Sequence, residues 1–146
     1  MTFRVEPATG DGLDAPLSLL EGSLREGDPL SETFLVELRG VVEKGDFEII
    51  AVYEHGAAIG VAVLSYRLSI SAGDLFASVE ELYVRPDARR RGVGQALLEE
   101  VGRCCEARGI SYVEVQAVDD VAEAFYESAG YQNEEGVRVM SRSYAL

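Results

Sequence analysis

The chain has 146 residues, enough for one domain with its own hydrophobic core. Its composition is 47% hydrophobic and 27% charged, which is ordinary for a soluble globular protein, and no apolar run approaches the roughly 20 residues that span a bilayer. The formal net charge of −13 argues against a nucleic-acid partner and suits a cationic small molecule or a basic peptide. We therefore expect a single domain over residues 1–146, without nucleic-acid or membrane partners.

The first residues and the cysteines indicate the cellular setting. Residues 1–6 lack the charged-then-apolar layout of a signal peptide, so we expect a cytoplasmic protein. Cys104 and Cys105 are adjacent, and on a helix they point about 100° apart, which is a poor arrangement for a disulfide or a shared metal. His55, the only histidine, falls in a predicted turn. We expect no metal site.

The N-terminal third carries helical patterns and no recognisable chemistry. Residues 2–6 alternate as a short strand, and leucines at helical spacing predict a helix over residues 11–26. Glycine and proline at 27–29 end that helix, and a second one is predicted over residues 31–44. The sequence does not indicate what these two helices do.

The central part of the chain predicts three strands, a helix and a fourth strand. The three strands form a meander at residues 47–53, 59–70 and 78–84. A helix over 92–108 and a strand over 111–117 follow. Because a strand, a helix and a strand with short joints form a right-handed crossover, we expect the last two of these strands to run parallel.

The C-terminal part predicts one more helix and a closing pair of strands. The helix covers residues 120–128, and two antiparallel strands are predicted at 131–133 and 137–144. The whole order is β-α-α-β-β-β-α-β-α-β-β. It predicts an α/β fold with a mixed sheet, in which residues 78–84 and 111–117 form the central parallel pair.

The turn before the helix at 92–108 has the composition of an anion site. Residues 89–94 read Arg-Arg-Arg-Gly-Val-Gly. Each glycine in a helix costs about 1 kcal/mol relative to alanine, so two of them require another reason. Helix N-termini present free N–H groups and a partial positive charge, and glycines let a phosphate approach the backbone. A dinucleotide-binding motif is excluded because Leu97 stands where its third glycine belongs.

Carboxylates on the two parallel strands indicate a cleft. Buried parallel strands usually read as continuous apolar runs. Here strict alternation places Glu80 and Glu81 on opposite faces of one strand, and Glu114 on the same face as Tyr112 and Gln116 in the other. We therefore expect these strands to border a cleft rather than a closed core.

The last predicted helix offers a proton donor. Val121 and Phe125 are four residues apart on its predicted buried stripe, and Tyr126 is turned about 100° away, toward the rim. A tyrosine hydroxyl can donate a proton, with a reference pKa of about 10. Tyr126 is a candidate acid, and a packing role is the alternative.

Three motifs together resemble the GNAT superfamily of N-acetyltransferases, which bind acetyl-CoA. Residues 89–94 match its signature Arg/Gln-x-x-Gly-x-Gly/Ala, and Glu-Leu-Tyr-Val-Arg-Pro at 81–86 precedes it as the family's bulged strand does. Residues 122–131, Ala-x-x-Phe-Tyr-x-x-x-Gly-Tyr, resemble its last-helix motif. The motifs cover residues 78–131, and the element order extends the resemblance from residue 47 to the end.

The resemblance implies acetyl-CoA as the acyl donor and assigns residues to it. The backbone of Leu82, Tyr83 and Val84 would pair with the pantetheine arm and polarise the thioester carbonyl. Asp119 stands where the family often has an asparagine near that arm, and Tyr126 would protonate the departing thiolate. The pyrophosphate would be held by the backbone amides and arginine side chains of Arg89, Arg90, Arg91, Gly92, Val93, Gly94 and Gln95.

The resemblance also implies direct transfer to an amine in a ternary complex, which needs a general base. Glu80 matches the catalytic glutamate of the polyamine-acetylating branch, and Glu114 matches that of the ribosomal-protein alanine acetyltransferases. Glu81 matches a carboxylate of some aminoglycoside acetyltransferases. We rank Glu80 and Glu114 equally and Glu81 third.

The acidic strands favour a small cationic acceptor, polyamine-like or aminoglycoside-like. The alternative acceptor is a protein N-terminus or a lysine side chain. An alternative of another class is a sensor domain that binds an acyl-CoA without catalysis. Dimers are common in the superfamily, so a homodimer is among the expected assemblies.

Overall fold

The computed structural model describes residues 2–145. The chain forms two compact units, Met1–Gln116 and Ala117–Leu146, and each is described by itself. The expectation of one domain over the whole chain stays a prediction.

The first unit is built on a five-stranded sheet with the strand order β1-β2-β3-β4-β5. Neighbouring strands are antiparallel except for the parallel pair β4 and β5, which confirms the predicted meander and crossover. The last strand is shorter than the predicted 111–117. The strands are β1 Arg4–Ala8, β2 Phe47–Glu54, β3 Ala57–Ser69, β4 Asp74–Val84 and β5 Val113–Val115.

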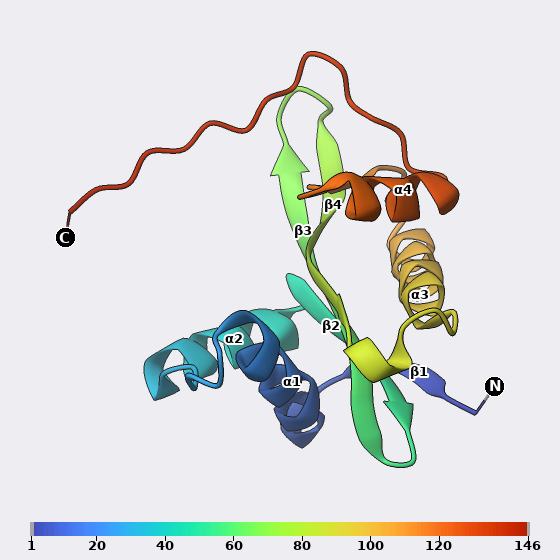
Figure 1. Cartoon of the computed structure of the whole chain (residues 1–146). Helices are drawn as coiled ribbons and strands as arrows, with labels where there is room; N and C mark the ends of the chain where they lie inside the picture. The colour runs from blue at the N-terminus through green and yellow to red at the C-terminus, as the bar shows by residue number, and fades with distance from the viewer. Residues whose placement is uncertain (1, 146) are drawn as a thin grey trace. The chain divides into compact units, whose positions relative to one another are not determined.

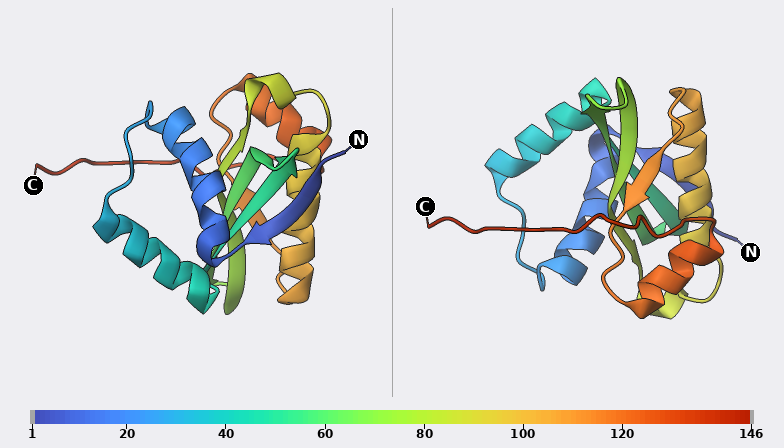
Figure 2. Two further views of the ribbon diagram at one scale, coloured as in Figure 1. Left: turned by 90° about the horizontal axis from the view of Figure 1, so that it is seen from below. Right: turned by 90° about the horizontal axis from the view of Figure 1, so that it is seen from above.

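Three helices of this unit cover the two faces of the sheet. A short 3-10 turn at Gly10–Leu13 leads into α1 (Asp14–Leu24), and α2 (Glu32–Lys44) follows. These two lie on one face, and α3 (Val93–Ala107) lies on the other (Figures 1 and 2). Ser31 is the N-cap of α2, since its hydroxyl accepts a hydrogen bond from the Phe34 amide at 3.2 Å.

The two faces of the sheet each carry their own apolar cluster. On the α3 face, Ala62 and Leu64 of β3 pack in one cluster with side chains of β4 and α3. On the opposite face, which we call the α1 face, Val61 and Val63 pack with leucines of α1 and α2. Successive β3 residues therefore alternate between the two helical layers, as the strand geometry requires.

An extra residue interrupts this alternation in β4. Val63 pairs with Glu81, but the next residue, Leu64, pairs with Val79, so Glu80 has no partner in β3. Because directly paired residues point to the same face, Glu81 lies on the α1 face with Val63. The predicted placement of Glu80 and Glu81 on opposite faces is therefore wrong, since strict alternation does not hold across a bulge.

Gly60 in β3 lets α3 approach the sheet closely. A Cβ atom built at this position would lie 2.8 Å from Cγ1 of Val93 and 3.4 Å from Cδ1 of Leu97. Val93 is the first residue of α3, and both it and Leu97 are buried. The missing side chain of Gly60 thus fixes where the helix begins relative to the end of β4.

The second unit contains α4 (Asp120–Ser128) and an extended segment (Figure 1). Among residues 131–145 the structure has no strand, so the two predicted strands at 131–133 and 137–144 are wrong. Val137, Val139 and Met140 are 69%, 70% and 90% exposed. An isolated two-stranded hairpin is marginally stable at best, and one of the predicted strands has just three residues.

The Gly60 contact predicts a destabilising substitution. Gly60→Ala lowers the free energy of unfolding by about 1–3 kcal/mol, because β-branched Val93 cannot move aside without shifting α3. Urea denaturation followed by circular dichroism measures this change. The matched control is Gly102→Ala within α3, where nothing lies within 4 Å of the added carbon. We expect it to be neutral or to stabilise by up to about 1 kcal/mol. Equal stability of Gly60→Ala and the wild type would contradict the close approach.

Candidate active site

The α1 face of β3 and β4 carries a hydrogen-bonded polar group beyond its apolar cluster. Glu80 accepts hydrogen bonds from the Ser65 hydroxyl and from the Arg67 guanidinium, the latter at 3.0 Å. The same guanidinium donates to the Ser78 hydroxyl at 2.9 Å. Since Ser65 pairs with Ser78 in the sheet and both are buried, these contacts hold the Glu80 carboxylate on the α1 face.

Glu81 and Glu114 lie on this face too. Glu114 pairs with Ser78 across the parallel strands, while its neighbours Val113 and Val115 pack in the cluster on the α3 face. Burial raises the pKa of Glu81 above its ordinary value, and the negative charge of Glu80 raises it further. The structure therefore brings the three candidate bases onto one face of the sheet.

The edge of β4 toward β5 is open beyond Val79. The parallel pairing ends at Val79 and Val115, whereas β4 continues to Val84. Leu82 and Tyr83 are paired with β3 on their other edge. In the sheet as described, this leaves a stretch of backbone that an extended ligand can pair with, as an added strand does. The Val84 carbonyl already accepts a hydrogen bond from Arg89 Nε at 3.0 Å.

The arginine-rich turn opens α3 with two residues in the left-handed region, Arg90 at φ 63° and Gly92 at φ 83°. No side chain caps the first turn of this 15-residue helix, so its N–H groups are available to an anion. Arg91 is paired with Glu54 of β2, and this contact lowers the pKa of the Glu54 carboxyl. Arg89 lies over the Tyr83 ring, 5.7 Å from its centroid.

Arg90 is the arginine of this turn that remains for a ligand. Within the described residues no hydrogen bond, ion pair or ring contact engages its exposed guanidinium. The backbone N–H groups and this one free charge fit a pyrophosphate. Arg89 and Arg91 instead hold the turn in place, since Arg89 binds the Val84 carbonyl of β4 and Arg91 binds Glu54 of β2.

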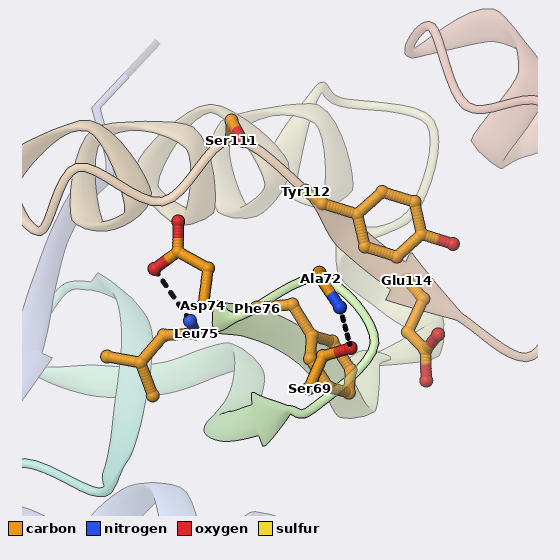
Figure 3. A pocket seen from close by; sticks show the side chains of 8 residues that line it. All are labelled: Ser69, Ala72, Asp74, Leu75, Phe76, Ser111, Tyr112 and Glu114. Atoms are coloured by element: carbon orange, nitrogen blue, oxygen red, sulfur yellow. Dashed lines mark hydrogen bonds between the residues drawn. The ribbon is translucent and has the colours of Figure 1, made fainter.

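A cavity of about 500 Å3 lies at the start of β4 and β5. Figure 3 shows the residues that line it, with Tyr112 and Glu114 on the segment at β5 and Phe76 on the β3–β4 hairpin. The rings of Phe76 and Tyr112 are 6.3 Å apart and tilted by 59°. The other polar lining residues are Ser69, Asp74 and Ser111. Because Phe76 pairs with Arg67 in the sheet, the cavity borders the polar group around Glu80.

The second unit holds Tyr126 and Asp119. The Asp119 carboxylate accepts a hydrogen bond from the Ala122 amide at 2.8 Å, which makes it the N-cap of α4. Tyr126 is 9% exposed and Val121 is 81% exposed, so the predicted stripe with Val121 inside and Tyr126 at the rim is wrong. The Tyr126 ring packs against Phe125 and Tyr131, at centroid distances of 5.1 Å and 5.6 Å.

The remaining candidate groups have structural explanations. Cys104 and Cys105 are buried in the cluster on the α3 face, and burial is the first cause that raises the pKa of Cys104 to about 12. His55 lies in the β2–β3 turn, as predicted, and it is exposed. Among the described residues no group of three potential ligands could hold a metal ion, and none of the described helices is long and apolar enough to cross a bilayer.

Several residues of this site carry no local signal in the sequence. Arg67 reaches Glu80 across 13 residues, and Glu54 reaches Arg91 across 37. Both contacts follow from the pairing of strands and from where α3 begins, so a pattern search along the chain does not find them. Phe76 carries no special signal either, because a half-buried aromatic residue next to the buried Ala77 is the ordinary pattern of a strand.

The fold is shared with several solved structures of acetyltransferases. An aminoglycoside acetyltransferase from an uncultured soil metagenomic sample, crystallised with trehalose, is 21% identical with a TM-score of 0.81, over 99% of this chain and 96% of that one. A Trypanosoma brucei acetyltransferase is 23% identical with a TM-score of 0.81, over 97% and 99%. AAC(6')-Iy, in complex with the bisubstrate analogue CoA-S-monomethyl-acetylneamine, is 19% identical with a TM-score of 0.81, over 99% and 100%.

Sequence comparison establishes the family. No curated protein sequence matches this chain. The family model for the acetyltransferase (GNAT) domain matches residues 45–133, which run from β2 through α4 and include the turn at the start of α3. That match covers more than half of the chain, and the shared fold and the anion site agree with it. The chain therefore belongs to the GNAT family of acetyltransferases and has its mixed α/β fold.

Proposed function

We propose that the protein transfers the acetyl group of acetyl-CoA to a primary amine of a small cationic acceptor, by direct attack in a ternary complex. The observation that carries this proposal is the shared face of Glu80, Glu81 and Glu114 next to the open edge of β4. Carboxylates in a protein of net charge −13 attract a cation to the place where an acyl donor can pair with the strand. Some of the solved structures with this fold are aminoglycoside acetyltransferases.

The turn at the start of α3 supports acetyl-CoA as the donor. Residues 89–95 would hold the pyrophosphate through backbone N–H groups, with Arg90 adding charge. The backbone of Leu82 and Tyr83 would pair with the pantetheine arm, and Val84 would add to that contact once Arg89 releases its carbonyl. A contact of Asp119 with the same arm stays a prediction. The hydrogen bond that its carboxylate accepts from the Ala122 amide supports a structural role as the N-cap of α4 in addition.

Glu81 is the general base that the contacts favour. Glu80 accepts hydrogen bonds from the Ser65 hydroxyl and the Arg67 guanidinium, so its carboxylate is already engaged within the protein. Glu81 has a raised pKa, which brings its basicity closer to that of an effective catalyst near neutral pH. We therefore place Glu81 ahead of Glu80 and assign Glu80 the task of holding negative charge beside it.

The acceptor ammonium loses one proton before the attack and a second one after it. Glu81 takes a proton from the acceptor ammonium, directly or through a water, and the freed nitrogen lone pair attacks the thioester carbonyl carbon. The carbon–sulfur bond breaks, and Tyr126 gives its hydroxyl proton to the leaving thiolate. The acceptor nitrogen loses its second proton as the amide forms, and this proton restores the Tyr126 hydroxyl, while the proton on Glu81 passes to solvent. Residues 122–131 resemble the last-helix motif of the family, and they lie within the residues that the family model matches. Both observations support this role of Tyr126.

A thiol-release assay with acetyl-CoA tests the function. We expect turnover with polyamines or aminoglycosides above that with amino acids or peptides. Tyr126→Phe should lower turnover by about 100-fold, the usual size for a lost proton donor, while CoA affinity measured by calorimetry changes little. Unchanged turnover of Tyr126→Phe would remove Tyr126 from the acid role. Turnover with peptides alone would favour a protein acceptor, and CoA binding without turnover on any amine would favour a sensor.

The pH dependence of kcat/KM tests the base. Glu81 must be deprotonated to act, so activity rises as the pH passes upward through its raised pKa. Glu80→Gln removes the negative charge that is the second cause of the raised Glu81 pKa, so the rise in activity should move to lower pH. Burial, the first cause, still keeps the pKa of Glu81 above its ordinary value. Glu81→Gln should lower kcat/KM by about 100-fold or more. The same acceptor amine is used for every variant, so the titration of the amine contributes equally to each pH profile.

The outcomes of this pH experiment separate the two glutamates. Glu106→Gln, an exposed change in α3, is the matched control and should leave the profile unchanged. A rise that stays in place or moves to higher pH in Glu80→Gln would contradict the coupling. Loss of the rise in Glu80→Gln alone would make Glu80 the base.

A further inference from the structure

We infer that the cavity at the start of β4 and β5 binds a second cationic group of the acceptor, with Glu114 as its counter-ion. The inference rests on the proposed transfer to an amine and deepens it. It assigns Glu114 to substrate selection rather than to proton transfer. The acceptor would then be a diamine or polyamine rather than a monoamine.

The lining of the cavity suits an ammonium group with an apolar stem. Phe76 and Tyr112 contribute two tilted aromatic rings. The Arg67 guanidinium already lies 5.6 Å from the centroid of the Phe76 ring, so Phe76 contributes apolar surface and the Tyr112 ring is the one that can attract an ammonium over its face. The two carboxylates of the lining, on Asp74 and Glu114, supply opposite charge, and Ser69 and Ser111 supply hydroxyls. Among the described residues that line the cavity none is a lysine, arginine or histidine, and the Arg67 guanidinium beside Phe76 is paired with Glu80.

The charges of the cavity differ from those around Glu80. The Glu80 carboxylate is compensated by the Arg67 guanidinium at 3.0 Å. Within residues 2–145 no hydrogen bond or ion pair engages the Glu114 carboxylate, which is half-buried. One Asp74 oxygen accepts a hydrogen bond from the Leu75 amide at 2.8 Å, and this bond leaves its charge uncompensated. A bound ammonium would supply the opposite charge that these two carboxylates lack.

The cavity and the proposed base lie on the same face at a fixed separation. Glu114 pairs with Ser78, and Glu81 follows Ser78 by three positions along β4, one of which is the bulge. With about 3.3 Å per strand residue and about 4.8 Å between neighbouring strands, the backbone positions of the two glutamates are about 8–11 Å apart. An acceptor that fills both places therefore carries two amino groups separated by about that distance.

A chain-length series of amines tests the subsite. The substrates are unbranched terminal diamines, from diaminopropane to diaminodecane, and the monoamines of the same length, each assayed by acetyl-CoA-dependent thiol release. We expect kcat/KM to be highest for diamines whose nitrogens are about 8–11 Å apart. Glu114→Gln should lower the ratio of kcat/KM for the best diamine to that for its monoamine by about tenfold, the size of one charge-assisted contact. Phe76→Leu should lower the same ratio by a smaller factor.

The ratio separates a binding role of Glu114 from a catalytic one. If Glu114 were the general base, Glu114→Gln would slow both substrates by the same factor, and an unchanged ratio would overturn the inference. A ratio near one in the wild type would overturn it as well. Glu106→Gln on α3 is the charge-matched control and should keep the wild-type ratio. A thermal melt of each variant checks that the fold is intact.

Calorimetry decides the subsite independently of catalysis. If no amine is acetylated, the transferase proposal fails, and the best-fitting diamine and its monoamine are then titrated into the full-length protein. About tenfold tighter binding of the diamine by the wild type, reduced to the monoamine level in Glu114→Gln, supports the subsite. Equal affinities for both ligands overturn it.

Discussion

The site depends on one extra residue in the fourth strand. Glu80 stands between Val79 and Glu81 without a partner in β3, and this insertion reverses the alternation of every residue after it. As a result Leu82 and Val84 return to the apolar cluster on the α3 face, while both glutamates lie on the α1 face. A bulge also bends the strand, and β4 separates from β5 just beyond this point.

The two halves of the site are held by different contacts. On the acceptor side, Arg67 binds both Ser78 and Glu80. Because Ser78 pairs with Glu114, Arg67 connects the bulge to the strand position that carries Glu114. On the donor side, the close approach of α3 at Gly60 and the ion pair of Arg91 with Glu54 fix the turn that faces an anion. The negative charge of Glu80 therefore serves both to anchor the bulge and to raise the pKa of Glu81.

The sequence predicted the parallel pair, the arginine-rich turn and the carboxylates, because these depend on short-range patterns. It did not predict that Glu80 and Glu81 share a face, since Val-Glu-Glu-Leu is compatible with regular alternation. Contacts such as Arg67 with Glu80 depend on strand pairing, which no local pattern specifies. The two strands predicted after residue 130 failed because alternation of apolar residues is not sufficient without a neighbouring strand. Tyr126 was misplaced because the helical period was anchored on Val121, which is exposed.

The register of β3 against β4 is the central claim, and cross-strand nuclear Overhauser effects measure it directly. In uniformly labelled protein, backbone contacts should join Val63 to Glu81 and Leu64 to Val79, and Glu80 should show no direct partner in β3. The Glu80 side chain should show contacts to Ser65. A regular register, with Leu64 opposite Glu80, would place Glu80 on the α3 face and would contradict the shared face of the carboxylates.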